Sequence, residues 1–384
     1  MDPNHAEQRE REDKPPSGPP PASDAAPFSG PGLQALLPEE IALRCDIDVS
    51  DARRIVSLIH RRGELPPKAP ATIRRAALDA VRALGSVGSI ETVERLESAV
   101  DPFVKYAFRL AGGAVIETVR IPLERPGRYS VCVSSQVGCA LACAFCATGM
   151  MGLVRNLEAW EIVEQVRIVR RDLAAEGRAP RVHGVLFQGM GEPLANVDRV
   201  IQAIRVLSEP SAQAIDMRNI TVCTAGLPAG IRRLLHEVPA VRIGLSLGSV
   251  LPGRRASLMP IERAHPLEEV LEAVGEHARA TGRSPMWAFT LLEGRNDTPD
   301  DARALSDLAR SFGEKHGKFP RISLIPYNAA PGLPFARSAR MEAFRDALHA
   351  RGIGSILRYS GGGDVGAACG QLSRAEGSRR RLSP

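Results

Sequence analysis

The hydrophobic pattern of the first hundred residues predicts a small helical domain behind a disordered segment. Apolar residues recur at helical spacing in three stretches, which begin at Pro38, near Ser50 and near Ala71. Proline suits a first helical turn, and Ser50 is a candidate N-cap for the second helix. Residues 1–32 lack such a pattern and hold 8 of the 30 prolines, so we expect them to be disordered. We expect an all-α accessory domain over residues 33–100.

The pattern changes at about residue 103, where short apolar runs rich in β-branched residues begin to alternate with amphipathic stretches. Such alternation is typical of βαβ units and a parallel sheet. About six units follow Tyr129, which is too few for a closed eight-fold barrel. We therefore predict an α/β fold with a partial (βα)6 barrel, whose chemistry lies at the carboxyl ends of the strands. The predicted strands are 114–121, 129–134, 182–187, 219–224, 241–246, 286–292 and 321–325.

Composition narrows the class of protein. The chain has 384 residues, 44% of them hydrophobic and 24% charged, which is ordinary globular usage. It contains no apolar run long enough to span a membrane, and no apolar signal core follows Met1. We expect a cytoplasmic protein without membrane attachment. The net charge of +6 is a mild indication of a nucleic-acid partner. Residues 374–384 form a basic tail, which we expect to be a frayed end.

Three of the seven cysteines fall within eight residues, and this cluster is the strongest chemical signal. An odd number of cysteines in a long chain without a signal peptide argues against a secreted disulfide framework. The CxxxCxxC spacing suits zinc or an iron–sulfur cluster. A structural zinc site needs four ligands, and no fourth Cys or His lies nearby. We name the three residues the cluster cysteines: Cys139, Cys143 and Cys146.

A [4Fe–4S] cluster held by three cysteines leaves one iron open, and that iron can chelate S-adenosylmethionine (SAM). CxxxCx(aromatic)C is the signature of radical SAM enzymes, and Phe145 occupies the aromatic place. One predicted strand later comes Gly189-Met-Gly-Glu-Pro193, which resembles the motif that binds the SAM amino group in these enzymes. Two glycines allow close backbone approach, and a carboxylate pairs with an ammonium group. A plain βα turn with a helix-capping Glu192 is the alternative.

Five motifs in order resemble the RlmN/Cfr family of radical SAM enzymes, which methylate adenine carbons in RNA. The resemblance covers residues 103–373 and extends more weakly into the helical region. It implies a TIM-like radical SAM barrel that binds a [4Fe–4S] cluster and uses two SAM molecules per turnover. The motifs are Val133-Ser-Ser-Gln-Val-Gly-Cys139, Gly189-Met-Gly-Glu-Pro-Leu194, Leu258-Met-Pro-Ile261, Ile325-Pro-Tyr-Asn328 and Ala367-Ala-Cys-Gly-Gln-Leu372.

The resemblance also implies a mechanism. Members of the family move a methyl group from one SAM onto a cysteine, and Cys369 matches that cysteine by position. A second SAM is cleaved to a radical, which removes a hydrogen from the methyl group so that it attacks the base. Cys132 matches the thiol that resolves the resulting adduct by forming a disulfide. Glu117 matches the proton acceptor. Two buried cysteines and a solvated strand glutamate are the ordinary alternatives for these residues.

The SAM pocket of the family carries over with two departures. Gly248 stands where the family usually has His, and Cys223 where it usually has Ser, which indicates a divergent branch. Gly248 keeps only its backbone N–H, and Cys223 only a weak donor. The residues that match the family's pocket are Gly191, Glu192, Ser246, Leu247 and Asn328.

We therefore expect a SAM-dependent methyltransferase that acts on carbon 2 of adenine in large-subunit rRNA, tRNA or both. Carbon 8, or a different RNA, is the nearest alternative. A degenerate iron–sulfur protein that binds RNA or senses redox state is another, motivated by the two departures. The resemblance further implies an electron donor such as flavodoxin or ferredoxin, and we expect a monomer.

Overall fold

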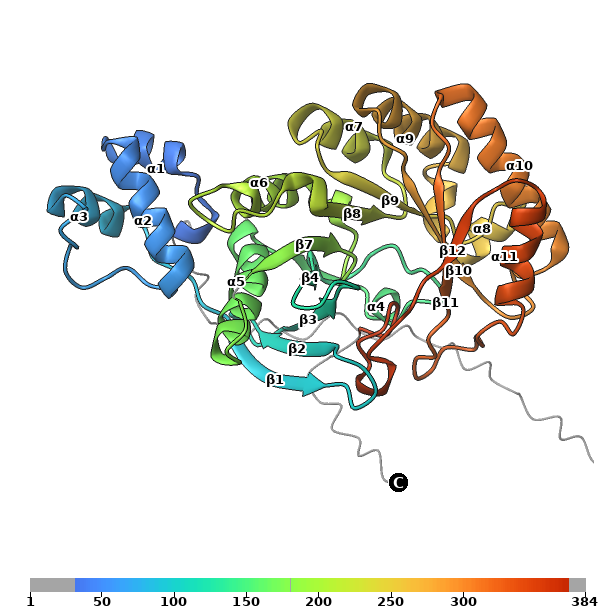
Figure 1. Cartoon of the computed structure of the whole chain (residues 1–384), viewed down its shortest axis with the longest axis horizontal. Coiled ribbons are helices and arrows are strands. Elements are labelled where there is room, and N and C mark those ends of the chain that lie inside the picture. The colour runs from blue at the N-terminus through green and yellow to red at the C-terminus, as the bar shows by residue number, and fades with distance from the viewer. Residues whose placement is uncertain (1–31, 180, 373–384) are drawn as a thin grey trace, which may run out of the picture.

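The computed structural model describes residues 32–179 and 181–372 (Figure 1). The segment predicted to be disordered, apart from Gly32, and the basic tail 374–384 lie outside the described residues. Three helices form the N-terminal part, which is blue in Figure 1 and lies beside the rest of the chain. They are α1 (Pro38–Cys45), α2 (Val49–Arg62) and α3 (Arg75–Leu84).

These three helices have a hydrophobic core of their own, which includes Ile55, Ile59 and Leu78. Pro38 is the first residue of α1, as the sequence predicts. The predicted N-cap of α2 is wrong: the cap is Asp48, whose carboxylate accepts a hydrogen bond of 2.7 Å from the Ser50 N–H. Ser50 lies inside the first turn, where its own N–H needs that acceptor.

A ten-stranded sheet forms the body of the protein, in the order β1-β2-β3-β4-β7-β8-β9-β10-β11-β12. Neighbouring strands are antiparallel from β1 to β4 and parallel from β4 to β12. β1 and β12 are the two edges, so the sheet is an open, partial barrel. The strands are β1 (Glu91–Glu97), β2 (Val104–Arg109), β3 (Val115–Pro122), β4 (Tyr129–Val133), β7 (Val182–Phe187), β8 (Ile220–Thr224), β9 (Arg242–Ser246), β10 (Met286–Leu291), β11 (Arg321–Pro326) and β12 (Ser355–Leu357).

The predicted partial (βα)6 barrel is confirmed. Each parallel strand from β4 to β11 is followed by a helix that packs on the outside of the sheet (Figure 1). A continuous hydrophobic core fills the space between the sheet and these helices. The helices are α5 (Ala159–Ala175), α6 (Val197–Ser208), α7 (Pro228–Glu237), α9 (Leu267–Thr281), α10 (Pro299–His316) and α11 (Met341–Ala350), with the short α4 (Ala147–Met150) and α8 (Arg254–Leu258) near the site.

All seven predicted strands exist, but the sequence pattern missed five others among the described residues. The short β5 (Gln136–Gly138) and β6 (Leu153–Asn156) pair with each other, and β2 and β12 were also missed. The expectation of helix throughout 33–100 is wrong at β1, which is an edge strand of the sheet. β1 is rich in charged residues and largely solvent-facing, so it lacks the alternation that marks a half-buried strand.

Polar contacts join the helical part to α5, to α6 and to the segments that follow α3 and α6. Gln34 is fully buried, and its side-chain amide donates to the Gly88 carbonyl and accepts from the Gly88 N–H, at 2.8 and 3.0 Å. His60 Nδ1 lies 2.9 Å from Gln213 Nε2, and burial lowers the pKa of His60 to about 3. The neutral imidazole is thus part of this contact. The functional division of the chain at residue 100 stays a prediction.

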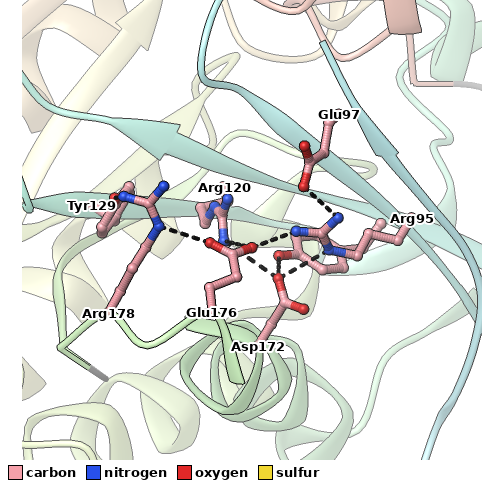
Figure 2. Close-up of polar contacts among 8 residues, drawn as sticks. Arg95, Glu97, Arg120, Tyr129, Asp172, Glu176 and Arg178 are labelled. Carbon is pink, nitrogen blue, oxygen red and sulfur yellow. Dashed lines mark hydrogen bonds and ion pairs between the residues drawn. The ribbon is translucent and has the colours of Figure 1, made fainter. Parts of the chain in front are cut away.

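A network of charged residues fixes β1–β3 against the C-terminal half of α5 (Figure 2). Arg120 from β3 donates to Asp172 and Glu176 at 3.3 and 2.8 Å, and Arg95 from β1 contacts the same two carboxylates. Burial acts to raise the pKa of Glu176, but hydrogen bonds from Arg120 and Arg178 outweigh it and lower that pKa. The network anchors the antiparallel part of the sheet to α5.

Among the helices that the structure describes, none has the length and apolar character needed to cross a membrane.

Candidate active site

The cluster cysteines lie on a loop between β5 and α4, and hydrogen bonds hold both sides of this loop. Gly138 precedes it with φ of +74°, and a Cβ there would lie 1.8 Å from the Gly152 carbonyl oxygen. The Cys139 N–H donates to that same carbonyl at 2.9 Å. On the other side, the Ala144 N–H donates to the Leu258 carbonyl of α8, also at 2.9 Å. These hydrogen bonds fix the backbone conformation of the loop. The glycine before the loop cannot be replaced by another residue without strain.

The three thiols are close enough to affect one another electrostatically. Burial raises the pKa of Cys139 to about 11 and that of Cys143 further, and the neighbouring thiols add to both shifts. Throughout residues 32–179 and 181–372, no three His, Cys, Asp or Glu side chains converge on a point where they could hold one metal ion. Three cysteine thiols on one loop are the donor set of a [4Fe–4S] cluster, in which each thiolate binds a different iron.

The turn after β7 places Glu192 beside the cluster loop. Gly189 lies against β4, where a Cβ would meet the Val133 carbonyl oxygen at 2.6 Å. Gly191 has φ of +99°, and a Cβ there would be 2.5 Å from Gln136 Cβ. The buried Glu192 carboxylate accepts hydrogen bonds from the N–H groups of Leu194 and Ala225, at 3.0 and 2.8 Å. Burial raises the pKa of Glu192 although these hydrogen bonds act to lower it. The buried carboxylate is therefore costly to ionise, and a bound ammonium group would stabilise its charged form.

The two departures from the family pattern lie on the neighbouring strands. Cys223 is buried in β8, and burial raises the pKa of its thiol to about 12. Ser246 ends β9, and Leu247 is fully buried behind it. Gly248 has φ of +68°, and a Cβ there would be 2.5 Å from the Met259 sulfur. This backbone conformation and the close sulfur both favour glycine at this position.

The segment that carries Cys369 is bound directly to the end of the cluster loop. The Ala147 N–H donates to the Gly370 carbonyl at 2.9 Å, and Thr148 Oγ1 donates to the Leu372 carbonyl at 2.5 Å. Asn328, after β11, donates from Nδ2 to the Cys369 carbonyl at 3.2 Å. The structure thus places Asn328 against the Cys369 segment, so this predicted SAM-binding residue also contacts the backbone of the predicted methyl carrier.

Cys132 and Cys369 line one cavity of about 120 Å³, together with Cys146. Both are free thiols, Cys132 buried and Cys369 half-buried. Burial raises the pKa of Cys132, and the neighbouring Cys369 and Cys223 raise it further, whereas the Arg358 guanidinium acts in the opposite direction. The two cysteines that the sequence separates by more than two hundred residues therefore face the same space, next to the cluster loop.

Glu117 lies on the same face of the sheet as this cavity. Val119, two residues after Glu117 on β3, pairs with Cys132 of β4 and lines the cavity. Residues two apart on a strand share a face. Glu117 itself is buried and does not line the cavity. Its carbonyl accepts a hydrogen bond of 2.6 Å from Ser134 Oγ, which ties β3 to the segment leading to the cluster loop. The roles predicted for Glu117 and the two cysteines stay predictions.

The structure also adds residues that sequence reasoning missed. Arg358 lines the cavity, and its Nη1 donates to Gln188 Oε1 at 3.3 Å. Lys105 of β2 forms an ion pair with Glu117. Buried Arg255 donates to the carbonyls of Leu247 and Ala225, which braces the ends of β9 and β8. No spacing rule marks these cations among the 50 lysines and arginines of the chain.

Comparisons with known proteins agree with this site. Residues 133–309 match the model of the radical SAM superfamily. A probable RNA methyltransferase of Sorangium cellulosum is 70% identical over 90% of this chain and 93% of its own length. The dual-specificity RNA methyltransferase RlmN of Syntrophobacter fumaroxidans is 44% identical over 73% of this chain and 79% of its own. The crystal structure of a radical SAM methyltransferase from Sphaerobacter thermophilus is 35% identical, with a TM-score of 0.79, and the match covers 89% of this chain and 98% of that one.

The fold and the cluster loop thus define a SAM-dependent radical enzyme that uses a [4Fe–4S] cluster. Within this superfamily the chain belongs to the RlmN/Cfr family of RNA methyltransferases.

Proposed function

We propose that this enzyme adds a methyl group to carbon 2 of an adenine in large-subunit rRNA, in tRNA or in both, through a methyl group carried on Cys369. The observation that carries the proposal is the shared cavity, which Cys132 and Cys369 line beside Cys146 of the cluster loop. Glu117 lies on the adjoining strand, on the same sheet face as Cys132. This proximity supports the roles proposed for Cys369 as methyl carrier, Cys132 as resolving thiol and Glu117 as proton acceptor.

The ring carbon explains why such an assembly is needed. Carbon 2 of adenine is not nucleophilic, so direct polar transfer of a methyl group from SAM fails there. A bound [4Fe–4S] cluster would supply the electron that splits the second SAM of each turnover. The cluster cysteines would hold the [4Fe–4S] cluster, and Glu192 would bind the amino group of SAM. The rest of the SAM molecule would contact Gly191, Ser246, Leu247, Gly248, Cys223 and Asn328.

The chain's own residues would then act in sequence. The Cys369 sulfur would accept a methyl group from the first SAM. That methyl group would give one hydrogen atom to the radical formed from the second SAM, and the resulting carbon radical would add to the adenine ring. The adduct gives up one electron, equal to the one supplied, and Glu117 accepts the ring proton. The Cys132 thiol attacks the Cys369 sulfur, a disulfide forms, and the released carbon takes up a proton to become the new methyl group. Two electrons from a donor such as flavodoxin or ferredoxin reduce the disulfide.

The shape of the cavity fits a single base. Its volume of about 120 Å³ excludes a helix, so the target adenine must leave its stack to enter. Tyr359 lines the cavity, is 68% exposed and packs edge-to-face on Phe103, which places an aromatic surface where a base would enter. A second groove lies on α2, about 300 Å³ in volume, and its arginines would contact phosphates. We name them the α2 arginines: Arg53, Arg54, Arg61 and Arg62.

The test is nucleoside mass spectrometry of rRNA and tRNA from a deletion strain and from the same strain complemented with the gene. The proposal expects 2-methyladenosine to disappear on deletion and to return on complementation. Loss of 8-methyladenosine instead would move the target to carbon 8. If neither nucleoside changes and the anaerobic, reduced protein does not cleave SAM, the enzyme is a degenerate iron–sulfur protein instead.

A further inference from the structure

A partly buried lysine and a buried glutamate face each other beside the cavity. Lys105 Nζ lies 3.1 Å from Glu117 Oε1, and the two side chains are 12% and 2% exposed. The two residues lie diagonally across the antiparallel pair of β2 and β3. Lys105 is opposite Val119, and Glu117 is two residues before Val119 on β3. Residues two apart on a strand share a face, so both side chains project on the face of Val119, the face that lines the cavity.

Lys105 also reaches the segment that carries the predicted methyl carrier. Its Nζ donates to the Gly366 carbonyl at 3.4 Å, three residues before Cys369. Gly366 has φ of +63°, and a Cβ there would lie 3.3 Å from Lys105 Nζ, so the chain passes close to the ammonium group. One side chain therefore contacts the predicted proton acceptor on β3 and the Cys369 segment together.

Burying an ammonium group is costly unless it gains specific partners. The positions two residues before and after Lys105, Phe103 and Ala107, are apolar and buried, and so is Val119 opposite. An apolar side chain would therefore suit the packing here, and the ion pair serves the geometry of the site better than it serves stability. A charge-assisted contact holds a carboxylate in one orientation, which a flexible glutamate side chain lacks on its own.

We propose that Lys105 is a positioning residue for the proton transfer that precedes resolution of the RNA adduct; the inference rests on the proposed function. The ammonium holds Glu117 in place and keeps it in register with the Cys369 segment. In the step itself the ring C–H bond breaks, an O–H bond forms on Glu117, and the electron pair stays in the ring. Lys105 neither gains nor loses a proton. No oxidant or reductant enters this step.

The test compares four variants of the full-length, cluster-loaded enzyme: Lys105→Met, Lys105→Arg, Glu117→Gln and the double variant Lys105→Met/Glu117→Gln. Lys105→Met should still cleave SAM and acquire a methyl group on Cys369, as intact-protein and peptide mass spectrometry would show. It should resolve the covalent RNA adduct about 10²-fold more slowly than the wild type, as expected when a reacting group is misplaced. On a denaturing gel, a nuclease-sensitive shifted band should accumulate. Lys105→Arg should restore much of the rate, and the double variant should be no slower than Glu117→Gln alone.

Arg109→Met is the matched control, because Arg109 is on the same strand but pairs with the exposed Glu91 at the surface. It should leave adduct resolution unchanged. If Lys105→Met does not fold, Lys105→Gln keeps a polar donor without the charge and tests the same point. Turnover at the wild-type rate without accumulated adduct would overturn the inference, and so would loss of Cys369 methylation, which would show a role in folding of the segment only. An inactive wild-type enzyme would instead refute the proposed function.

Discussion

Gln165 of α5 offers a sharp test of how the site is held together. This fully buried side chain accepts hydrogen bonds from Thr118 Oγ1 and the Ser134 N–H, at 2.6 and 2.8 Å. Its amide donates to the Ser134 carbonyl at 3.0 Å. It therefore joins α5 to β3, beside Glu117, and to the segment that leads into the cluster loop. We predict that Gln165→Leu both destabilises the protein and weakens SAM cleavage.

The expected loss of stability follows from the groups that leucine leaves behind. The N–H and the carbonyl of Ser134 are buried and lose these partners. An unsatisfied buried group costs about 1–3 kcal/mol, so the two backbone groups together predict about 2–6 kcal/mol. Thr118→Val removes one side-chain bond and leaves Gln165 bound to Ser134, so it should cost only about 1 kcal/mol.

Equilibrium urea unfolding of the cluster-free proteins, followed by circular dichroism and tryptophan fluorescence, measures these differences. Anaerobic SAM cleavage by the reconstituted proteins measures the effect on the site. The reasoning would be refuted if Gln165→Leu lay within about 1 kcal/mol of the wild type, or if Thr118→Val were as damaging as Gln165→Leu.

Four further predictions follow. Replacing any one of the cluster cysteines with alanine should abolish the brown chromophore and SAM cleavage together, and stoichiometric zinc in an active preparation would contradict this. Gly191→Ala should abolish SAM binding, measured by equilibrium dialysis, because its Cβ would overlap Gln136. Changing the α2 arginines to serine should leave SAM cleavage intact but weaken RNA binding, and the slope of log affinity against log salt should become shallower by roughly 0.7–0.9 for each phosphate that is no longer neutralised. Because burial lowers the pKa of His60 from 6.5 to about 3, unfolding takes up a proton between these two pH values; over that range the wild type should lose about 1.4 kcal/mol of stability for each unit that the pH falls, relative to His60→Leu.

The sequence predicts most of the longer, buried strands and misses the short or charged ones, for a physical reason. Buried parallel strands are rich in apolar and β-branched residues, as at β8 and β10, and such runs stand out between amphipathic helices. β1 is charged and has no buried residue, and β5, β6 and β12 are three or four residues long. Short or exposed strands bury too little apolar surface to leave a pattern.

The residues of the candidate site also fall into two groups, those that the sequence could identify and those that it could not. Residues inside ordered motifs, such as Glu192 and Cys369, could be named from the sequence because neighbouring positions identify them. Lys105 and Arg358 could not, because their importance depends on which strands become neighbours. β2 and β12 are far apart in the chain, yet the segments beside both of them reach the cavity that Cys132 and Cys369 line. Only the fold reveals that convergence.

The two thiols at this cavity provide the most direct test of the chemistry. Under the proposed function, Cys369→Ala lacks the sulfur that accepts the first methyl group, so it should never acquire a methyl group and never bind RNA covalently. Cys132→Ala keeps Cys369 and can be methylated and attack the base. It lacks the thiol that releases the thioether, so it should accumulate protein linked to RNA, provided that no other thiol reaches the Cys369 sulfur.

The structure supplies one further thiol to consider, because Cys223 is near enough to raise the pKa of Cys132. The double variant Cys132→Ala/Cys223→Ser should therefore be compared with Cys132→Ala on a denaturing gel after expression in cells. A nuclease-sensitive shifted band in both, and none for Cys369→Ala, supports the assignment of Cys132 as the resolving thiol. Turnover by Cys132→Ala that disappears in the double variant would transfer that role to Cys223. Full turnover by both, or an RNA adduct on Cys369→Ala, would show that neither cysteine has the role given to it here.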